Sequence, residues 1–343
     1  MITLEKLAKV TGVSRATIDR VIHNRPSVKE KTRKKVLKAI EEIGYTPNSI
    51  GKALALQKKL NFGIIISADL MPEDNTLFSY ILEGMQLCMK RLENTGVNFI
   101  IERMNTGSET EQIEAIYHLI ELGVTGIALS PEGKGEEILR ALAYAREKGI
   151  VVVCYYNDIK GENYDYFVGS DSIREGKVSA ELLEKFIDSS AKVAIFSGLL
   201  KNNVHQTRMN SAVEKIKADY SHIDVVQTIT GSYTENIAYN LCIEIIEKYP
   251  DLKGIIASCG GISGIMTALK EKNKLDKIKI IFFDFTRKAQ YYLKEGTIDA
   301  LIGVDLTRLG YNTIKALYEK VLYGYIDDME LFEPMLIKTK ECL

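Results

Sequence analysis

The chain has 343 residues, which exceeds one ordinary hydrophobic core and suffices for two or three compact units. With 46% hydrophobic and 27% charged residues, it has the composition of a soluble globular protein rather than of a fibrous or disordered one. The formal net charge is only −1, but residues 1–59 carry 14 Lys and Arg against 5 Asp and Glu, whereas the remainder carries 31 against 41. A basic N-terminal segment on an acidic body predicts a polyanionic partner for that segment alone.

Cysteine usage and the N-terminus exclude two further classes of protein. The five cysteines, which form no CxxC pair and have no histidine near them, fit reduced thiols better than a disulfide framework or a zinc site; they are Cys88, Cys154, Cys242, Cys259 and Cys342. The first residues, MITLEKLAKV, contain an acid and no apolar run, so they are not a signal peptide, and no segment has the length of a membrane span. We therefore expect a cytoplasmic protein with no membrane partner, no metal and no cofactor.

Residues 3–44 have the pattern of three short helices. Leu4, Leu7 and Ala8 share one face of the first, and TGVS then interrupts it with a glycine and offers Ser14 as the N-cap of a second helix over roughly 14–22. The third helix, in VKEKTRKKVLKAIEEIG, has an apolar stripe and ends at a glycine.

The second helix presents a polar face. At about 100° per residue, Thr17, Ile18 and Val21 lie on the side that packs inward, and the opposite arc carries Arg15, Ala16, Asp19, Arg20 and His23. Two helices joined by a tight turn, the second with such a face, form a helix-turn-helix that reads the major groove of DNA. The alternative is a basic three-helix bundle that binds another protein.

After residue 61 the pattern changes to strands alternating with helices. Ten apolar runs have strand character: NFGIIIS, VNFIIERM, TGIALS, GIVVVCYY, YFVGS, KVAIFSG, IDVVQTITG, GIIASC, KIKIIFFD and DALIGVD. Such alternation predicts βαβ units and parallel sheets. Ten strands are too many for one comfortable sheet, so we expect two α/β lobes.

These motifs together resemble the LacI/GalR family of bacterial transcription regulators, and the resemblance spans essentially the whole chain. It is carried by TLEKLAKVTGVSRATIDRVIHNR, by KTRKKVLKAIEEIGYTPN, by the following linker and by the two-lobed body. The implied fold is an all-α helix-turn-helix domain followed by a two-lobed α/β domain of the type I periplasmic-binding-protein class with parallel sheets. The implied function is a sequence-specific transcription regulator, a repressor, controlled by a small polar effector.

By the resemblance, Arg15, Ala16 and Arg20 meet base edges, while Ser14 and Thr17 lie near phosphates. The chemistry agrees, because an arginine donates two hydrogen bonds to guanine and an alanine leaves room for a thymine methyl group. The predicted DNA-binding set is Thr3, Ser14, Arg15, Ala16, Thr17, Asp19, Arg20, Lys29, Arg33, Asn48, Lys52 and Leu54.

Asp19 departs from the family, which usually has a serine there. Three roles are open to its carboxylate: a weak helical pair with Arg15, acceptance from a cytosine amine, or bracing of Arg15 or Arg20 in one rotamer. We favour bracing.

The segment TPNSIGKALAL is predicted to be a hinge helix, capped by Asn48 and weakened by Gly51. The resemblance places Leu54 where a leucine wedges into the minor groove, the alternative being that it packs on the body. Two such hinge helices imply a homodimer on a near-palindromic operator.

In the body, polar residues recur at strand ends, where two-lobed binding proteins hold their ligands. Arg208 stands where the family's ligand arginine commonly lies, and Asn105 and Glu132 also follow strands. The predicted effector set is Asp69, Phe78, Ser130, Tyr156, Asn157, Asp158, His205, Arg208, Gly260, Asp284 and Asp305.

Two departures from the family bear on the ligand. Gly260 and Gly261 replace a usual Asn-Asp pair, and Val304 replaces a usual glutamine, so an ordinary hexose is not implied. We expect a sugar or sugar derivative, with a carboxylated or phosphorylated metabolite as the alternative. An enzyme is disfavoured, because GxGxxG, GxxxxGK[ST] and GxSxG are absent and no histidine has a metal-ligand spacing.

The predicted boundaries are 1–46 for the DNA-binding domain, 47–60 for the hinge and 61–343 for the effector-binding and dimerisation domain. Within the last, lobe 1 is expected at about 61–158 plus 287–323, and lobe 2 at about 159–286 plus 324–343.

Overall fold

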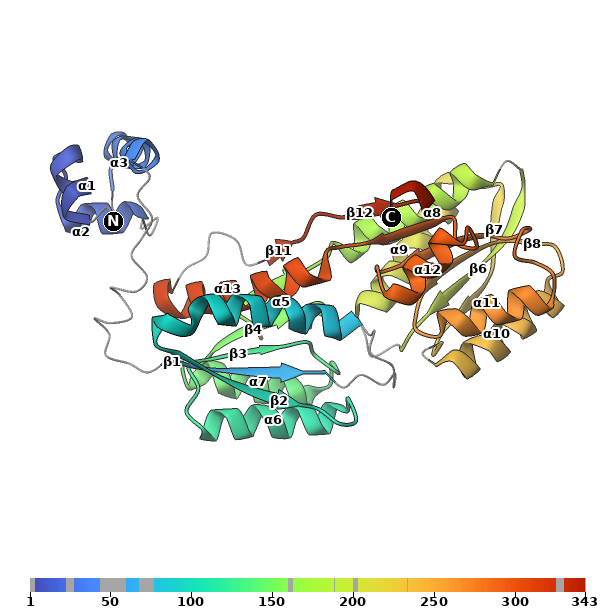
Figure 1. Ribbon diagram of the computed structural model, residues 1–343, viewed down its shortest axis with the longest axis horizontal. Coiled ribbons are helices and arrows are strands. Elements are labelled where there is room, and N and C mark those ends of the chain that lie inside the picture. The colour runs from blue at the N-terminus through green and yellow to red at the C-terminus, as the bar shows by residue number, and fades with distance from the viewer. Residues whose placement is uncertain are drawn as a thin grey trace.

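A computed structural model gives the fold of the protein (Figure 1). It describes residues 4–22, 28–43, 60–67, 77–159, 163–187, 189–199, 203–232, 234–324 and 330–342. The structure has a small helical head, residues 4–43, and a two-lobed body, which begins at residue 60. No helix within these residues is long and apolar enough to cross a membrane.

The head consists of three helices: α1 (Leu4–Thr11), α2 (Arg15–Ile22) and α3 (Glu30–Ile43). The predicted turn between α1 and α2 is confirmed, because Gly12 has φ +62° and the Ser14 side chain accepts from the Thr17 backbone N–H at 3.3 Å. The helices share a core of their own, made by Leu7, Ile18, Val21, Val36 and Ala39. Ile18 and Val21 therefore face inward, as their spacing predicts.

The ten predicted strands are all present, in two six-stranded sheets, each completed by a short strand near the C-terminus. In the first sheet the order is β11-β5-β4-β3-β1-β2, with β1 (Leu60–Ile66), β2 (Val97–Arg103), β3 (Gly126–Leu129), β4 (Val151–Tyr155), β5 (Tyr166–Gly169) and β11 (Glu330–Phe332). In the second the order is β12-β10-β9-β8-β6-β7, with β6 (Ala191–Ser197), β7 (Ile223–Ile229), β8 (Leu252–Ser258), β9 (Lys279–Phe283), β10 (Ala300–Gly303) and β12 (Leu336–Lys338). Pairing is parallel throughout, except between β10 and β12.

Helices cover both faces of each sheet. Lobe 1 is built on the first sheet, with α5 (Leu77–Leu92) and α13 (Leu306–Tyr323) on one face and α6 (Glu109–Glu121) and α7 (Glu136–Glu147) on the other. Lobe 2 is built on the second, with α8 (Ser172–Phe186) and α9 (Asn203–Asp219) on one face; α10 (Glu235–Lys248), α11 (Ile262–Glu271) and α12 (Arg287–Lys294) cover the other. Two single-turn 3₁₀ helices, Glu93–Thr95 and Lys340–Cys342, complete the described elements.

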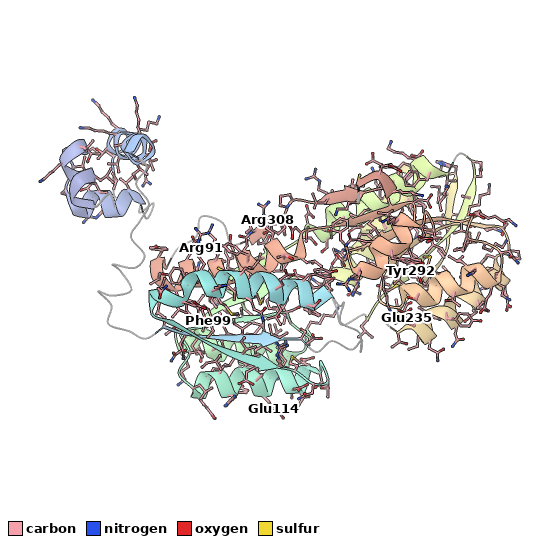
Figure 2. The ribbon with its side chains drawn as sticks, in the orientation of Figure 1. Arg91, Phe99, Glu114, Glu235, Tyr292 and Arg308 are labelled. Carbon is pink, nitrogen blue, oxygen red and sulfur yellow. The ribbon has the colours of Figure 1, made fainter. Side chains whose placement is uncertain are left out.

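Two glycines allow the helices α5 and α13 to pack closely. A Cβ on Gly84 of α5 would lie 1.8 Å from the carbonyl oxygen of Thr307, and one on Gly310 of α13 would lie 1.9 Å from that of Ile81. At the surface of the same pair, Arg91 donates to the hydroxyl of Tyr311 at 2.9 Å, and Figure 2 labels Arg91 there. The α5–α13 contact thus combines close backbone approach at the two glycines with side-chain contact at Arg91 and Tyr311.

The predicted lobe boundaries need correction, because strand pairing and helix packing assign four segments differently: β5, α12, β10 and β11. β5 pairs with β4 and so belongs to lobe 1, whereas α12 and β10, which pack and pair on the second sheet, belong to lobe 2. β11 and β12 divide the C-terminal segment between the lobes. The prediction put the first crossing at the polar break after YYND, but the chain crosses one strand later, between β5 and α8.

Candidate functional site

The centre of the candidate effector site is Arg208, on the second turn of α9. Its side chain is fully buried, and each of its three nitrogens donates to a carboxylate: Nε to Glu175 Oε2 at 2.8 Å, Nη1 to Asp284 Oδ2 at 3.0 Å and Nη2 to Asp284 Oδ1 at 3.1 Å. The guanidinium carbon also lies 4.6 Å from the centre of the Phe283 ring. Such a paired, stacked arginine is rigidly oriented.

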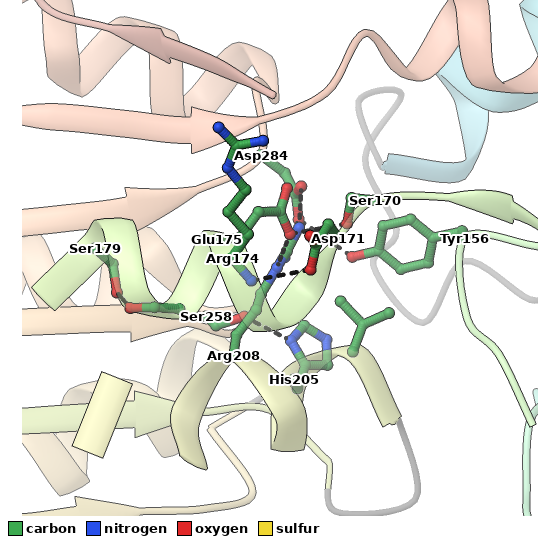
Figure 3. Close-up of polar contacts among 12 residues, drawn as sticks. Tyr156, Ser170, Asp171, Arg174, Glu175, Ser179, His205, Arg208, Ser258 and Asp284 are labelled. Carbon is green, nitrogen blue, oxygen red and sulfur yellow. Dashed lines mark hydrogen bonds and ion pairs between the residues drawn. The ribbon is translucent and has the colours of Figure 1, made fainter. Parts of the chain in front are cut away.

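The two lobes meet at this arginine. Tyr156, which follows β4 of lobe 1, donates from its hydroxyl to Asp284 Oδ2 at 3.1 Å (Figure 3). Tyr156 and Asp284 both have left-handed backbone conformations, with φ of 59° and 65°, which non-glycine residues seldom adopt. Each nevertheless keeps a backbone hydrogen bond to a neighbouring strand, from Tyr156 N to Val168 O and from Asp284 N to Ile302 O. The unusual φ therefore turns the side chain toward the other lobe at the strand end.

Sequence reasoning missed Glu175. It lies in the first turn of α8, is fully buried, and accepts from Ser170 Oγ at 2.8 Å as well as from Arg208. Its second oxygen, Oε1, has no hydrogen-bond partner within the described part of the chain. Burial raises the pKa of Glu175 above its usual range, against the opposing effect of Arg208. We refer to Arg208, Glu175, Asp284, Tyr156 and Ser170 as the Arg208 network.

His205 lies one turn before Arg208 on α9. Its Nδ1 is 3.0 Å from Ser258 Oγ, and its ring packs over Gly198, where an added Cβ would be 3.0 Å away. Burial and the neighbouring Arg208 charge lower the pKa of His205 to about 4. A neutral imidazole beside a cation can both donate and accept, so it suits a ligand hydroxyl.

Buried serines recur near the ends of strands in both sheets, and sequence reasoning largely missed them. Five lie at or directly after strand ends, and a sixth follows β7: Ser67, Ser130, Ser170, Ser197, Ser258 and Ser232. Among the described residues, the hydroxyls of Ser67 and Ser197 have no hydrogen-bond partner. The sequence does contain an indication of them, because a serine recurs at the end of several predicted strands. The predicted effector set includes only Ser130 among these serines.

Other predicted effector residues have different surroundings. Asn157 and Asp158 join the lobes, because Asn157 donates to Pro131 O at 2.6 Å and accepts from Asn203 N at 2.9 Å, and Asp158 accepts from the Asn203 amide. Asp305 is exposed and caps α13 by accepting from Arg308 N at 2.9 Å.

Three more predicted positions lie at the edge of the network or outside the description. Phe78 packs edge-on against Tyr156, with ring centroids 5.9 Å apart. Gly260 lies between β8 and α11, where Gly261 has φ +71°. Asp69 lies outside the described residues.

The candidate DNA-binding face lies on the head. Arg20 and Lys29 are exposed and Arg33 is half-buried, while the Ser14 and Thr17 hydroxyls are 2.9 Å apart at the start of α2. Arg15, Ala16 and Asp19 lie on α2, but their side chains are outside the described part, as are Thr3, Asn48, Lys52 and Leu54 altogether. Their predicted roles remain predictions.

Two family models match this chain, one over the head and one over the body. Residues 3–48 match the family model of bacterial regulatory proteins of the lacI family, and residues 70–324 match the periplasmic binding protein domain.

Relatives by sequence are regulators. The "Probable HTH-type transcriptional repressor ExuR" of Bacillus subtilis (strain 168) is 25% identical over 295 residues, covering 85% of this chain and 84% of that protein. The HTH-type transcriptional repressor PurR of Pasteurella multocida (strain Pm70) is 24% identical over 327 residues, covering 94% and 92%.

Similar solved structures are solute-binding proteins. One from Bacillus halodurans C-125 with bound myo-inositol has a TM-score of 0.74 at 20% identity, covering 82% of this chain and 95% of that one. One from Burkholderia graminis C4D1M in complex with D-arabinose has a TM-score of 0.75 at 20% identity, covering 83% and 96%. With a lacI-type head and a periplasmic-binding-protein body, this chain belongs to the lacI family of bacterial transcription regulators.

Proposed function

We propose that a small polyhydroxy effector, a sugar or sugar derivative, binds between the lobes at the Arg208 network and controls how tightly this repressor holds its operator. The observation that carries the proposal is the hydrogen bond from the Tyr156 hydroxyl of lobe 1 to the Asp284 carboxylate of lobe 2. It shows that the oriented carboxylate accepts an O–H group presented from the other lobe. The hydroxyls of a sugar are groups of the same kind.

The surroundings support a ligand rich in hydroxyl groups. Arg208 retains N–H groups beyond the three that donate to carboxylates, His205 is neutral, and unpaired serine hydroxyls line the strand ends. The rings of Phe78 and Tyr156 add an apolar wall. Solved structures of similar fold hold myo-inositol and D-arabinose, which are polyhydroxy compounds.

The partners follow from the head and the family. We propose a cytoplasmic homodimer that binds a near-palindromic duplex through two heads, with Arg20 at base edges and Lys29 and Arg33 at phosphates. Because the relatives are transcription regulators, we assign the Arg208 network to binding and not to catalysis.

A thermal-shift screen of the purified body against sugars, polyols, sugar acids and phosphosugars tests the effector site. We expect a compound that raises the melting temperature of the wild type and has no such effect on Asp284→Asn or Tyr156→Phe. Both changes keep the shape of the side chain and remove one hydrogen-bonding property. A compound that stabilises both variants as strongly as the wild type would place the effector site elsewhere.

A further inference from the structure

The Arg208 network has an unusual balance of charge for a site that contains an arginine. Its single cation is shared by two carboxylates, so the sum is −1 with Glu175 ionised and zero with Glu175 protonated. In neither state is the network positive. The electrostatic attraction that an arginine offers to an anionic ligand is therefore already satisfied within the protein.

Geometry points the same way. A carboxylate or phosphate binds an arginine best through two parallel hydrogen bonds to adjacent nitrogens. In this structure Asp284 holds the Nη1–Nη2 edge at 3.0 and 3.1 Å, and Glu175 holds Nε at 2.8 Å. An anionic ligand would have to displace one of these carboxylates, whereas a hydroxyl needs only one remaining N–H group.

Glu175 is a buried, hydrogen-bonded part of the Arg208 network. Its side chain is fully buried, Ser170 also donates to it, and its Oε1 has no partner among the described residues. A buried, unpaired carboxyl oxygen is costly unless a donor reaches it. The hydrogen of a ligand hydroxyl would satisfy it, while an ionised Glu175 would repel a second carboxylate.

We infer, on the basis of the proposed effector site, that Glu175 sets the ligand class: the site takes an uncharged polyhydroxy compound and excludes its carboxylated and phosphorylated counterparts. Glu175 acts here by occupying Nε of Arg208. When ionised, it also adds negative charge to a network in which Asp284 already neutralises the arginine.

The test uses the intact protein, matched ligands and three variants. The ligands are D-glucose with D-glucuronate and D-glucose 6-phosphate, D-galactose with D-galacturonate, myo-inositol, and sodium acetate as a small carboxylate. The variants are Glu175→Ala, Glu175→Gln, and Glu181→Ala as the control, because Glu181 lies on the same helix with its side chain 49% exposed. Circular dichroism first establishes which variants fold, and Glu175→Gln keeps the shape if Glu175→Ala does not fold.

We expect uncharged compounds alone to stabilise the wild type, and the anions to stabilise at least one folded Glu175 variant. The preference for the uncharged member of a pair should fall on the order of tenfold or more in that variant, and Glu181→Ala should behave as the wild type. A response of Glu175→Ala alone would assign the exclusion to occupancy of Nε, and a response of both variants would assign it to charge.

Two results would overturn the inference: an acid that stabilises the wild type at least as well as its uncharged parent, or folded Glu175 variants that respond to no anion. The first leaves the proposed effector site intact. Conversely, a wild type that binds no sugar beside a Glu175→Ala variant that responds to acetate would overturn the sugar effector and retain the role of Glu175.

Discussion

His205 links the candidate site to pH through its position between Arg208 and Ser258. Its pKa of about 4 in the folded protein lies below the ordinary value of 6.5. Between pH 4 and pH 6.5, His205 is therefore protonated in the unfolded chain and neutral in the folded protein. Stability from this residue is therefore complete above about pH 6.5 and is lost as the pH falls toward 4. At about 1.4 kcal/mol per pH unit, the total is at most roughly 3 to 4 kcal/mol.

We predict that His205→Gln flattens the loss of stability over this window. Urea unfolding at pH 7.0, 6.0, 5.0 and 4.5 measures it, with the exposed His222→Gln as the control. If the variant lost stability with falling pH as steeply as the wild type, His205 would not be held neutral by its surroundings.

At the scale of elements, the contact of α5 with α13 depends on two glycines. An alanine at position 84 gains up to about 1 kcal/mol in helix propensity, but its Cβ would overlap the carbonyl of Thr307, and overpacking against backbone costs about 1–3 kcal/mol or more. The clash exceeds the gain because a backbone atom cannot rotate away.

We predict that Gly84→Ala and Gly310→Ala each lower the free energy of unfolding, whereas Gln86→Ala, on the exposed side of α5, changes it by about 0.5 kcal/mol or less. Chemical unfolding of the body measures all three. A Gly84→Ala protein as stable as the wild type would show that the two helices separate easily.

Helix α2 of the head carries a second prediction at this scale. Arg20→Ala should cost about 1–3 kcal/mol in specific binding and relax the preference at one base pair per half-site. For Asp19→Ser, bracing predicts weaker discrimination with unchanged nonspecific binding, and cytosine readout predicts a lost preference at one position. Selection from a randomised duplex library measures both, and an unchanged selected sequence for Asp19→Ser excludes both roles.

The helices and strands were largely predictable from the sequence, because the hydrophobic period and the residues that end an element are local properties. The ten strands and the turn at Gly12 and Ser14 all follow from residues close to one another. The assignment of β5 and β10 to lobes depends on which strands pair, and nothing local specifies it.

The site divides in the same way. Arg208 and Asp284 were identified from their places after strands and from family resemblance. Glu175 was not, since a glutamate in the first turn of a helix ordinarily faces solvent and supports the helix dipole. The packing of α8 against α9 and the second sheet turns it inward, which no local pattern specifies. Asn157 and Asp158 also follow a strand, as Asp284 does. They nevertheless accept hydrogen bonds from Asn203 at the N-terminal end of α9.

In the whole molecule, the head and the body have separate hydrophobic cores, and the chain crosses three times between the lobes. Separate cores predict that a chain of residues 60–343 folds, keeps its ligand response and binds no duplex.

The basic head predicts that the affinity of the intact chain for duplex DNA falls steeply with salt, with about −0.9 added to the log–log slope per neutralised phosphate. Filter binding between 50 and 300 mM salt measures this, and a slope near zero would count against a DNA-binding head.

A ligand held between the lobes biases their arrangement only by its different affinity for the two arrangements. The most direct test is the affinity of the intact protein for a duplex selected from a random library, measured with and without the compound found in the thermal-shift screen. We predict that the compound changes the affinity of the wild type by about 5- to 150-fold and leaves that of Asp284→Asn unchanged. An effector that stabilises the protein but leaves duplex affinity the same, or that alters it equally in Asp284→Asn, would contradict control of DNA binding through the Arg208 network.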